Sequence, residues 1–125
     1  MKASIIIIVD IKDFSNILKS GCSEDIAHYL STYYNCIENN LIPLCWKIVK
    51  TMGDAVLISA EINNTEKDLK LFHKTISEKY NVTLKYRKCE IIEKDVLFDN
   101  YSCLDIFGHD INNLFLNDHL TKKLG

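Results

Sequence analysis

The chain has 125 residues, of which 47% are hydrophobic and 26% charged, and its formal net charge is −2 at pH 7. This size and composition predict one globular domain over residues 1–125 and exclude a disordered chain. The single arginine, Arg87, among many lysines argues against a nucleic-acid partner, because nucleic-acid binders usually carry a basic patch with several arginines.

The first predicted element is a strand at residues 5–9. This run is wholly apolar and β-branched, which is typical of a central strand buried on both faces, and it ends in the carboxylate of Asp10. The run is too short to span a membrane and lacks the cleavage-site chemistry of a signal peptide. We therefore expect no membrane partner.

Two helices are predicted next. Residues 11–18 indicate a turn that enters a short helix, which Gly21 ends as a helix C-terminal glycine commonly does. Ser23 has the residue type of an N-cap for a second helix. Apolar residues then repeat at helical spacing, Tyr33 among them, to about Asn39.

A central hairpin follows, with two β-like runs at residues 45–50 and 55–60 around the tight pair Gly53 and Asp54. Glycine lets the chain reverse without steric cost, and aspartate tolerates turn geometry. If this hairpin and the first strand are neighbours, Asp10 and Asp54 converge, and such carboxylates can hold one or two Mg²⁺ ions. The alternatives are a helix cap for Asp10 and ordinary turn chemistry for Asp54.

The second half of the chain predicts four further elements. An amphipathic helix runs from about Thr65 to Tyr80, strands cover 81–87 and 101–106, and a terminal helix covers 110–122. The order βααββαββα predicts an α+β fold of the ferredoxin-like palm kind, with an antiparallel-rich sheet and helices packed on one face.

The five cysteines are dispersed along the chain without a CxxC pair or a histidine-linked spacing. An odd number of scattered thiols fits a reducing compartment and argues against a zinc site or a disulfide framework. We therefore expect a cytoplasmic protein.

Three short motifs resemble the signatures of class III nucleotidyl cyclases, the adenylyl and guanylyl cyclase catalytic domain. Residues 10–15 (DIKDFS) are similar to D-I-x-G-F-[ST], residues 50–55 (KTMGDA) to K-T-x-G-D-[AG], and residues 105–112 (DIFGHDIN) to D-x-x-G-x-x-V-N. The motifs occur in the family's order, each at a predicted strand end, and the resemblance covers about residues 5–120.

The resemblance implies a two-metal site. Asp10 and Asp54 match the metal-binding aspartates, with the carbonyl of Ile11 also facing the ions, which would be Mg²⁺ or Mn²⁺. Phe14 and Ser15 match the segment whose backbone wraps the phosphates. The reaction implied is attack of the ribose 3′-OH on the α-phosphate, which yields a 3′,5′-cyclic mononucleotide and pyrophosphate.

The resemblance also implies a substrate. Lys50 and Asp105 match the pair that reads adenine in adenylyl cyclases, where guanylyl cyclases have Glu and Cys. A lysine can donate to N1 of adenine and a carboxylate can accept from its 6-amino group, so ATP is favoured. Asn112 matches the asparagine that orients the ribose. In the family the metal-binding and base-reading residues of one centre come from different protomers, which implies a head-to-tail homodimer.

The sequence departs from the family in several places. Asp13 stands at a family glycine, Leu116 stands at a family arginine, and the region that supplies a triphosphate-binding lysine is reduced, with Lys122 or Lys123 as candidates to replace it. Two alternatives stay open: a palm-type cyclic oligonucleotide synthase, and a degenerate cyclase-like module that binds a nucleotide or regulates a partner. The cyclase interpretation is preferred because both functional pairs of the family are present.

Overall fold

A computed structural model describes residues 2–61 and 66–125. Its elements in chain order are β1 (Lys2–Ile11), α1 (Phe14–Ser20), α2 (Ser23–Leu41), the 3₁₀ turn η1 (Ile42–Leu44), β2 (Lys47–Met52), β3 (Ala55–Glu61), α3 (Glu66–Ser77), β4 (Val82–Leu97), β5 (Ser102–Phe107), α4 (His109–Phe115) and β6 (Lys122–Leu124). None of the helices in the described residues is both long and apolar enough to cross a membrane.

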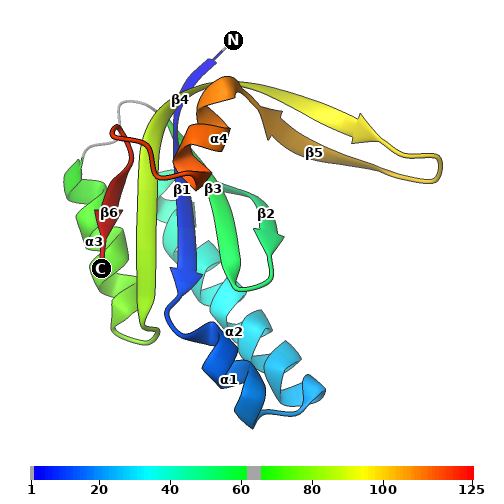
Figure 1. The fold of residues 1–125 in the computed structure, drawn as a ribbon, viewed down its shortest axis with the longest axis vertical. Helices are drawn as coiled ribbons and strands as arrows, with labels where there is room; N and C mark the ends of the chain where they lie inside the picture. The colour runs from blue at the N-terminus through cyan, green and yellow to red at the C-terminus, as the bar shows by residue number, and fades with distance from the viewer. Residues whose placement is uncertain (1, 62–65) are drawn as a thin grey trace.

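The strands form a six-stranded antiparallel sheet in the order β2-β3-β1-β4-β5, and β6 pairs with β4. β1 lies at the centre, as its apolar run predicts, and it pairs with β3 on one side and β4 on the other (Figure 1). The predicted α+β palm is therefore confirmed. That the chain forms one domain over 1–125 stays a prediction.

The two faces of the sheet carry separate cores, because side chains alternate along a strand. Ile7 and Val9 of β1 pack into a cluster with residues of α2 and α3, whereas Ile6 and Ile8 pack with Leu114 of α4 on the opposite face. This double burial explains why the β1 run is apolar at every position. The helices are thus not all on one face as predicted: α2 and α3 cover one face, and α4 covers the other.

β4 is longer than the predicted strand at 81–87, because its second half leaves the body of the sheet and pairs with β5. The paired segments form an arm that projects from the molecule, labelled β5 in Figure 1. Polar and apolar residues do not alternate along this arm. The alternation that predicts the first part of β4 therefore does not predict its second part.

The predicted terminal helix at 110–122 is wrong in its second half. α4 ends at Phe115, the chain turns at Asn117 with φ of 54°, and β6 begins at Lys122. Asparagine tolerates this left-handed conformation better than most residues and here redirects the chain toward β4. Strand pairing with β4 then overrides the helical pattern of the last residues.

Two further helix ends differ from prediction. Cys22 occupies the N-cap of α2, so Ser23 is the first helical residue. The predicted start of the next helix at Thr65 lies outside the described residues, and α3 ends at Ser77, before Tyr80.

Candidate functional site

The end of β1 and the turn between β2 and β3 meet at one edge of the sheet. Asp10 is the penultimate residue of β1, and Asp54 lies in the turn that joins β2 to β3. The backbone N–H of Ile11 donates a hydrogen bond to Oδ2 of Asp54 at 3.1 Å. This bond holds Asp54 beside the end of β1 and brings the two aspartates together.

The two carboxylates influence each other electrostatically. Partial burial raises the pKa of Asp10, and the negative charge of Asp54 raises it further, while Lys85 and Lys123 act in the opposite direction. A hard cation bound between the two carboxylates would relieve this repulsion.

The carboxylates of Asp10 and Asp54 provide only part of a coordination shell, which suits Mg²⁺ or Mn²⁺ better than a metal whose ligands all come from the protein. Within residues 2–61 and 66–125, no group of three or more His, Cys, Asp or Glu side chains gathers at one point. Mg²⁺ is commonly bound by one or two carboxylates, with water and substrate phosphates as its other ligands. Asp10 and Asp54 supply such a partial set.

Two neighbouring tyrosines of α2 brace this edge. Tyr33 is buried and its hydroxyl donates to the carbonyl of Val9 at 3.4 Å, and burial, followed by the charges of Asp54 and Asp10, raises its pKa. The hydroxyl of Tyr34 donates to the carbonyl of Gly53 in the turn. Helical spacing predicts Tyr33 as a core residue but gives no signal for Tyr34, because such spacing does not say which loop a helix will contact.

The turns at this edge use left-handed backbone. Gly53 has φ of 62°, which suits glycine, and Asp13 has φ of 55° immediately before α1. Position 13, where the cyclase motif that residues 10–15 resemble has glycine, therefore keeps a conformation that favours glycine although its residue is aspartate. Phe14 and Ser15 form the first turn of α1 directly after it.

Lys50 and Asp105 lie side by side. Nζ of Lys50 on β2 is 2.9 Å from Oδ2 of Asp105 on β5, and Oδ1 of Asp105 accepts the N–H of Ile106. Burial alone would raise the pKa of Asp105, but these two hydrogen bonds outweigh it and lower the pKa below its usual value. Both side chains keep part of their surface exposed, so a ligand can reach them.

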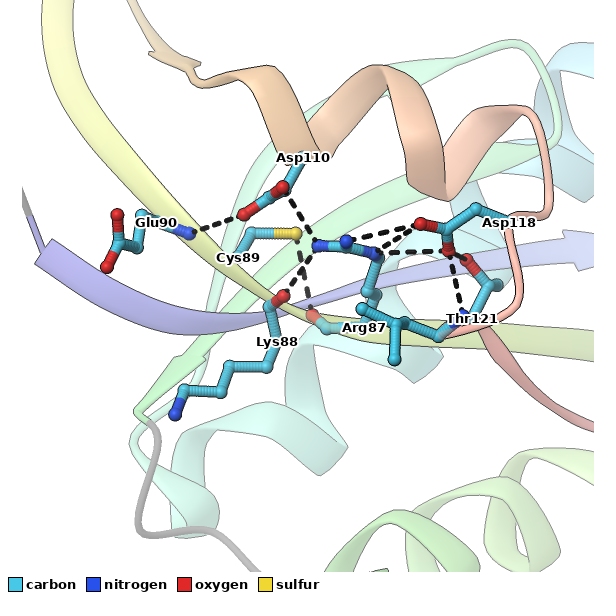
Figure 2. A network of polar contacts seen from close by, with 8 residues as sticks. Arg87, Lys88, Cys89, Glu90, Asp110, Asp118 and Thr121 are labelled. Atoms are coloured by element: carbon cyan, nitrogen blue, oxygen red, sulfur yellow. Dashed lines mark hydrogen bonds and ion pairs between the residues drawn. The ribbon is translucent and has the colours of Figure 1, made fainter.

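A buried arginine ties α4 and the segment after it to β4. Arg87 is 6% exposed and forms ion pairs with Asp110 at 3.3 Å and Asp118 at 3.2 Å (Figure 2). Its guanidinium also donates to the carbonyl of Lys88. The chain's single arginine thus has a structural role and points at two aspartates rather than at open solvent.

α4 approaches β4 closely at its N-terminus. A Cβ at Gly108 would overlap the carbonyl oxygen of Glu90, so only glycine fits there. Asn112 is exposed on this helix, on the face of the sheet that carries α4. Leu116 caps the end of α4 with 77% of its surface exposed, and it presents no charge.

Comparison with solved structures identifies the class of fold to which this chain's structure is similar. No protein-family model and no curated protein sequence matches the chain. The non-canonical dimeric guanylyl cyclase domain of the RhoGC fusion protein from the aquatic fungus Blastocladiella emersonii matches over 98% of this chain and 76% of its own, with a TM-score of 0.79 and 14% identity. The catalytic core of a rhodopsin-guanylyl cyclase with converted specificity, in complex with ATPαS, matches over 98% and 74%, with a TM-score of 0.79 and 17% identity.

The adenylyl cyclase CyaB from P. aeruginosa matches over 97% of this chain and 73% of its own, with a TM-score of 0.71 and 14% identity. The structure is therefore an α+β palm with carboxylates at the strand ends. More closely, it has the fold of class III adenylyl and guanylyl cyclase catalytic domains.

Proposed function

We propose that this chain is a nucleotidyl cyclase domain that converts a nucleoside triphosphate, ATP by preference, into a 3′,5′-cyclic mononucleotide and pyrophosphate. The observation that carries this proposal is the hydrogen bond from Ile11 N–H to Asp54, which sets Asp54 beside Asp10 within a class III cyclase fold. Two carboxylates at strand ends are what phosphoryl transfer with bound metal ions requires.

Asp10, Asp54 and the carbonyl of Ile11 would hold two Mg²⁺ or Mn²⁺ ions. Such ions, when bound, lower the pKa of the attacking hydroxyl and neutralise charge on the phosphates. The protein itself positions the reacting groups. Through Tyr33 and Tyr34, α2 holds the two backbone segments that carry Asp10 and Asp54. No side-chain nucleophile is needed, because the ribose hydroxyl is the nucleophile.

The remaining site residues orient the substrate. Lys50 donates to N1 of adenine and Asp105 accepts from its 6-amino group; guanine presents the opposite donor and acceptor pattern on that edge. The ion pair between these two side chains supports this assignment, because it places a donor and an acceptor side by side. Asn112 orients the ribose, and the backbone N–H groups of Phe14 and Ser15 contact the phosphates.

We propose that the active form is a head-to-tail homodimer, so that each centre combines Asp10 and Asp54 of one protomer with Lys50 and Asp105 of its partner. The projecting β4–β5 arm supports this assembly (Figure 1). Large apolar side chains are exposed along the arm, with Leu97 at 80% and the stacked pair Phe98 and Tyr101 near its tip. Exposed apolar surface of this kind marks a protein interface.

The test is incubation with each of the four nucleoside triphosphates and Mn²⁺, with products separated by mass-resolved chromatography. A cyclic mononucleotide that is absent with Asp10→Ala and with Asp54→Ala supports the proposal and identifies the base. A linear or cyclic dinucleotide would instead assign the chain to the oligonucleotide synthases. No product with any nucleotide would refute the enzymatic proposal.

One observation favours a second candidate, a nucleotide-binding module without turnover. Leu116 is exposed and uncharged at the position of a family arginine, and Arg87 is engaged by Asp110 and Asp118. Loss of an arginine that stabilises the transition state costs about 10³-fold or more in related phosphoryl transfers. Metal-dependent nucleotide binding without any product would support this candidate, and turnover that Asp54→Ala abolishes would exclude it.

A further inference from the structure

A cavity lies at the outer edge of β4, where the sheet is incomplete. β6 pairs with β4 at residues 84–86, and β5 pairs with it at residues 92–97. Within residues 2–61 and 66–125, the stretch 87–91 between them therefore has a strand partner, β1, on one side only. A cavity of about 600 Å³ opens at this stretch, between α3, β4, α4 and the segment that leads into β6.

The cavity is separate from the edge of the sheet that carries Asp10 and Asp54. One of its lining residues, Ile5, is opposite Lys88, whereas Asp10 is opposite Thr83. Asp10 thus follows Ile5 by five residues of β1, which corresponds to about 17 Å at the rise of an antiparallel strand. The proposed function therefore makes no use of this space.

The inner wall of the cavity is apolar. Leu69 of α3 and Tyr86 of β4 are buried residues of the core between the sheet and α3, and Ile5 packs against the same core. Leu120, in the segment before β6, also lines the cavity and is 55% exposed. A concave apolar surface of this size is typical of sites for small molecules. The wall therefore suits a molecule that is mainly apolar.

The backbone at this edge is already engaged, which disfavours a polypeptide strand as the occupant. The carbonyl of Lys88 accepts a hydrogen bond from Nη1 of Arg87 at 2.9 Å, and the N–H of Glu90 donates to Oδ2 of Asp110 at 3.4 Å (Figure 2). Gly108 lies against the carbonyl of Glu90. An added strand would displace these contacts, because it pairs through the same N–H and C=O groups. The edge therefore suits a small molecule better than a strand.

The charged groups around the cavity cancel one another. On one side Nζ of Lys122 lies 2.6 Å from Oε1 of Glu66, and on the other Arg87 is neutralised by the two aspartates of its network. Lys88 and Glu90 belong to no ion pair in the described parts of the chain, but they carry opposite charges two positions apart on one face of β4. A charged ligand would lose hydration without gaining an unmatched partner. The occupant is therefore expected to be uncharged.

The carboxylate of Glu66 can orient such a ligand. Its Oε1 accepts hydrogen bonds from Nζ of Lys122 and, at 3.4 Å, from the hydroxyl of Tyr86, and within residues 2–61 and 66–125 its Oε2 accepts none. Glu66 also lines the cavity. A hydroxyl or N–H group of a ligand could donate to Oε2, and hydrogen bonds to an ionised acceptor are stronger than neutral ones.

We propose that this cavity binds an uncharged, mainly apolar small molecule that carries one hydrogen-bond donor. Its apolar body lies against Leu69 and Leu120, where burial of apolar surface supplies most of the affinity. Its donor binds Oε2 of Glu66, which selects among apolar molecules. Binding at this site needs neither nucleotide nor metal, so the proposal does not depend on cyclase activity.

The first test examines the chemical class of the ligand with three probes of similar size. 2-Naphthol, 2-methoxynaphthalene and 2-naphthoate are each titrated into the full chain at pH 7 and followed by ligand-observed NMR. We expect 2-naphthol to bind, and 2-methoxynaphthalene, which has no donor, to bind about tenfold more weakly. 2-Naphthoate should bind more weakly still, because its charge is unmatched. Glu66→Ala should remove the difference between 2-naphthol and 2-methoxynaphthalene.

Equal affinity for 2-naphthol and 2-naphthoate would overturn the proposal, as would an absence of binding by 2-naphthol. A preference for 2-naphthol over 2-methoxynaphthalene that persists in Glu66→Ala would overturn the role of Glu66.

The second test examines the location of the site. Leu120→Trp places a larger side chain at the cavity wall and is expected to weaken 2-naphthol binding about tenfold or more, because the indole ring takes up the space of the ligand. Leu71→Trp is the matched control, since Leu71 is 59% exposed on α3 and does not line the cavity. Asp54→Ala is also expected to bind 2-naphthol as the wild type does.

Thermal unfolding of each variant checks that the fold is intact. Equal weakening by Leu120→Trp and Leu71→Trp would show non-specific surface binding and overturn the proposal. Loss of 2-naphthol binding in Asp54→Ala would place the probe at the proposed nucleotide site and would overturn it as well.

Discussion

Nζ of Lys50 lies 2.9 Å from Oδ2 of Asp105, although 55 residues separate them in the sequence. Neither residue is unusual alone, since one is a strand lysine and the other precedes a strand end. Their contact arises because the arm formed by β4 and β5 brings β5 close to β2. The pair thus places a donor and an acceptor side by side, as recognition of a purine edge requires.

Exchange of this pair should change base preference. Lys50→Glu combined with Asp105→Cys is expected to reverse the ratio of initial rates with ATP and GTP, because the new side chains match the donor pattern of guanine. Lys47→Glu is the matched control, since Lys47 lies on the same strand and pairs with Glu93 at 2.9 Å. An unchanged ATP preference in the double variant would contradict the assignment of Lys50 and Asp105.

Removal of one charge at the proposed metal site should stabilise the protein in the absence of metal. Because the pKa of Asp10 is raised in the folded state, the folded chain holds this proton more tightly than the unfolded chain does. Ionisation of Asp10 therefore lowers the free energy of unfolding. This loss of stability grows as pH rises through and above 3.8, the ordinary pKa of an aspartate.

Asp10→Asn is accordingly expected to raise Tm at pH 7 in a chelator, with a gain that shrinks as pH falls toward 3.8. Mn²⁺ should raise the Tm of the wild type more than that of the variant. Asp99→Asn, at an exposed site on the hairpin arm, is the control. A lower Tm for Asp10→Asn at pH 7 would argue against repulsion between the two carboxylates.

Asp13→Gly should stabilise the chain and strengthen nucleotide binding. Glycine adopts the φ of 55° found here without strain, which is worth about 0.5–1 kcal/mol, and the substitution removes a negative charge near the phosphates. Asp13→Ala removes the same charge but keeps a Cβ, so it should improve binding and lower stability. Denaturant unfolding and nucleotide titration separate the two effects. Equal stability of the glycine and alanine variants would contradict the backbone explanation.

Tyr34→Phe should reduce cyclase activity more than stability. The substitution removes the hydrogen bond from the hydroxyl to the carbonyl of Gly53, so the turn that carries Asp54 is less well held. We expect kcat to fall about tenfold, the effect of losing one neutral hydrogen bond at a positioned group, with a small change in Tm. Tyr29→Phe on the same helix is the control. A loss of equal size in both variants would show a general effect of α2.

Arg87→Met should destabilise the fold, because it leaves the carboxylates of Asp110 and Asp118 without their shared partner. Urea unfolding monitored by circular dichroism measures the loss. Arg87→Lys retains charge but not the planar fork and should be intermediate. Further change of both aspartates to asparagine in the Arg87→Met chain should restore part of the stability. Wild-type stability of Arg87→Met would rule out the network as an anchor.

Local features of the sequence determined much of this protein. The apolar run of β1, the turn at Gly53 and the helical spacing of α2 and α3 depend on residues close together in the chain, so their patterns predict them. The same patterns place Asp10 and Asp54 at strand ends. Those predictions held because steric and burial preferences act over a few residues.

Only the tertiary structure decided which side chains meet. The contact of Lys50 with Asp105, the bond from Tyr34 to Gly53 and the packing of α4 on the second face depend on pairing between distant segments. Strand register is the physical reason, because a shift of one residue turns a side chain to the opposite face. The pairing of β6 with β4 thus places Lys122 and Lys123 on opposite faces of the sheet, and Lys122 reaches Glu66 on α3.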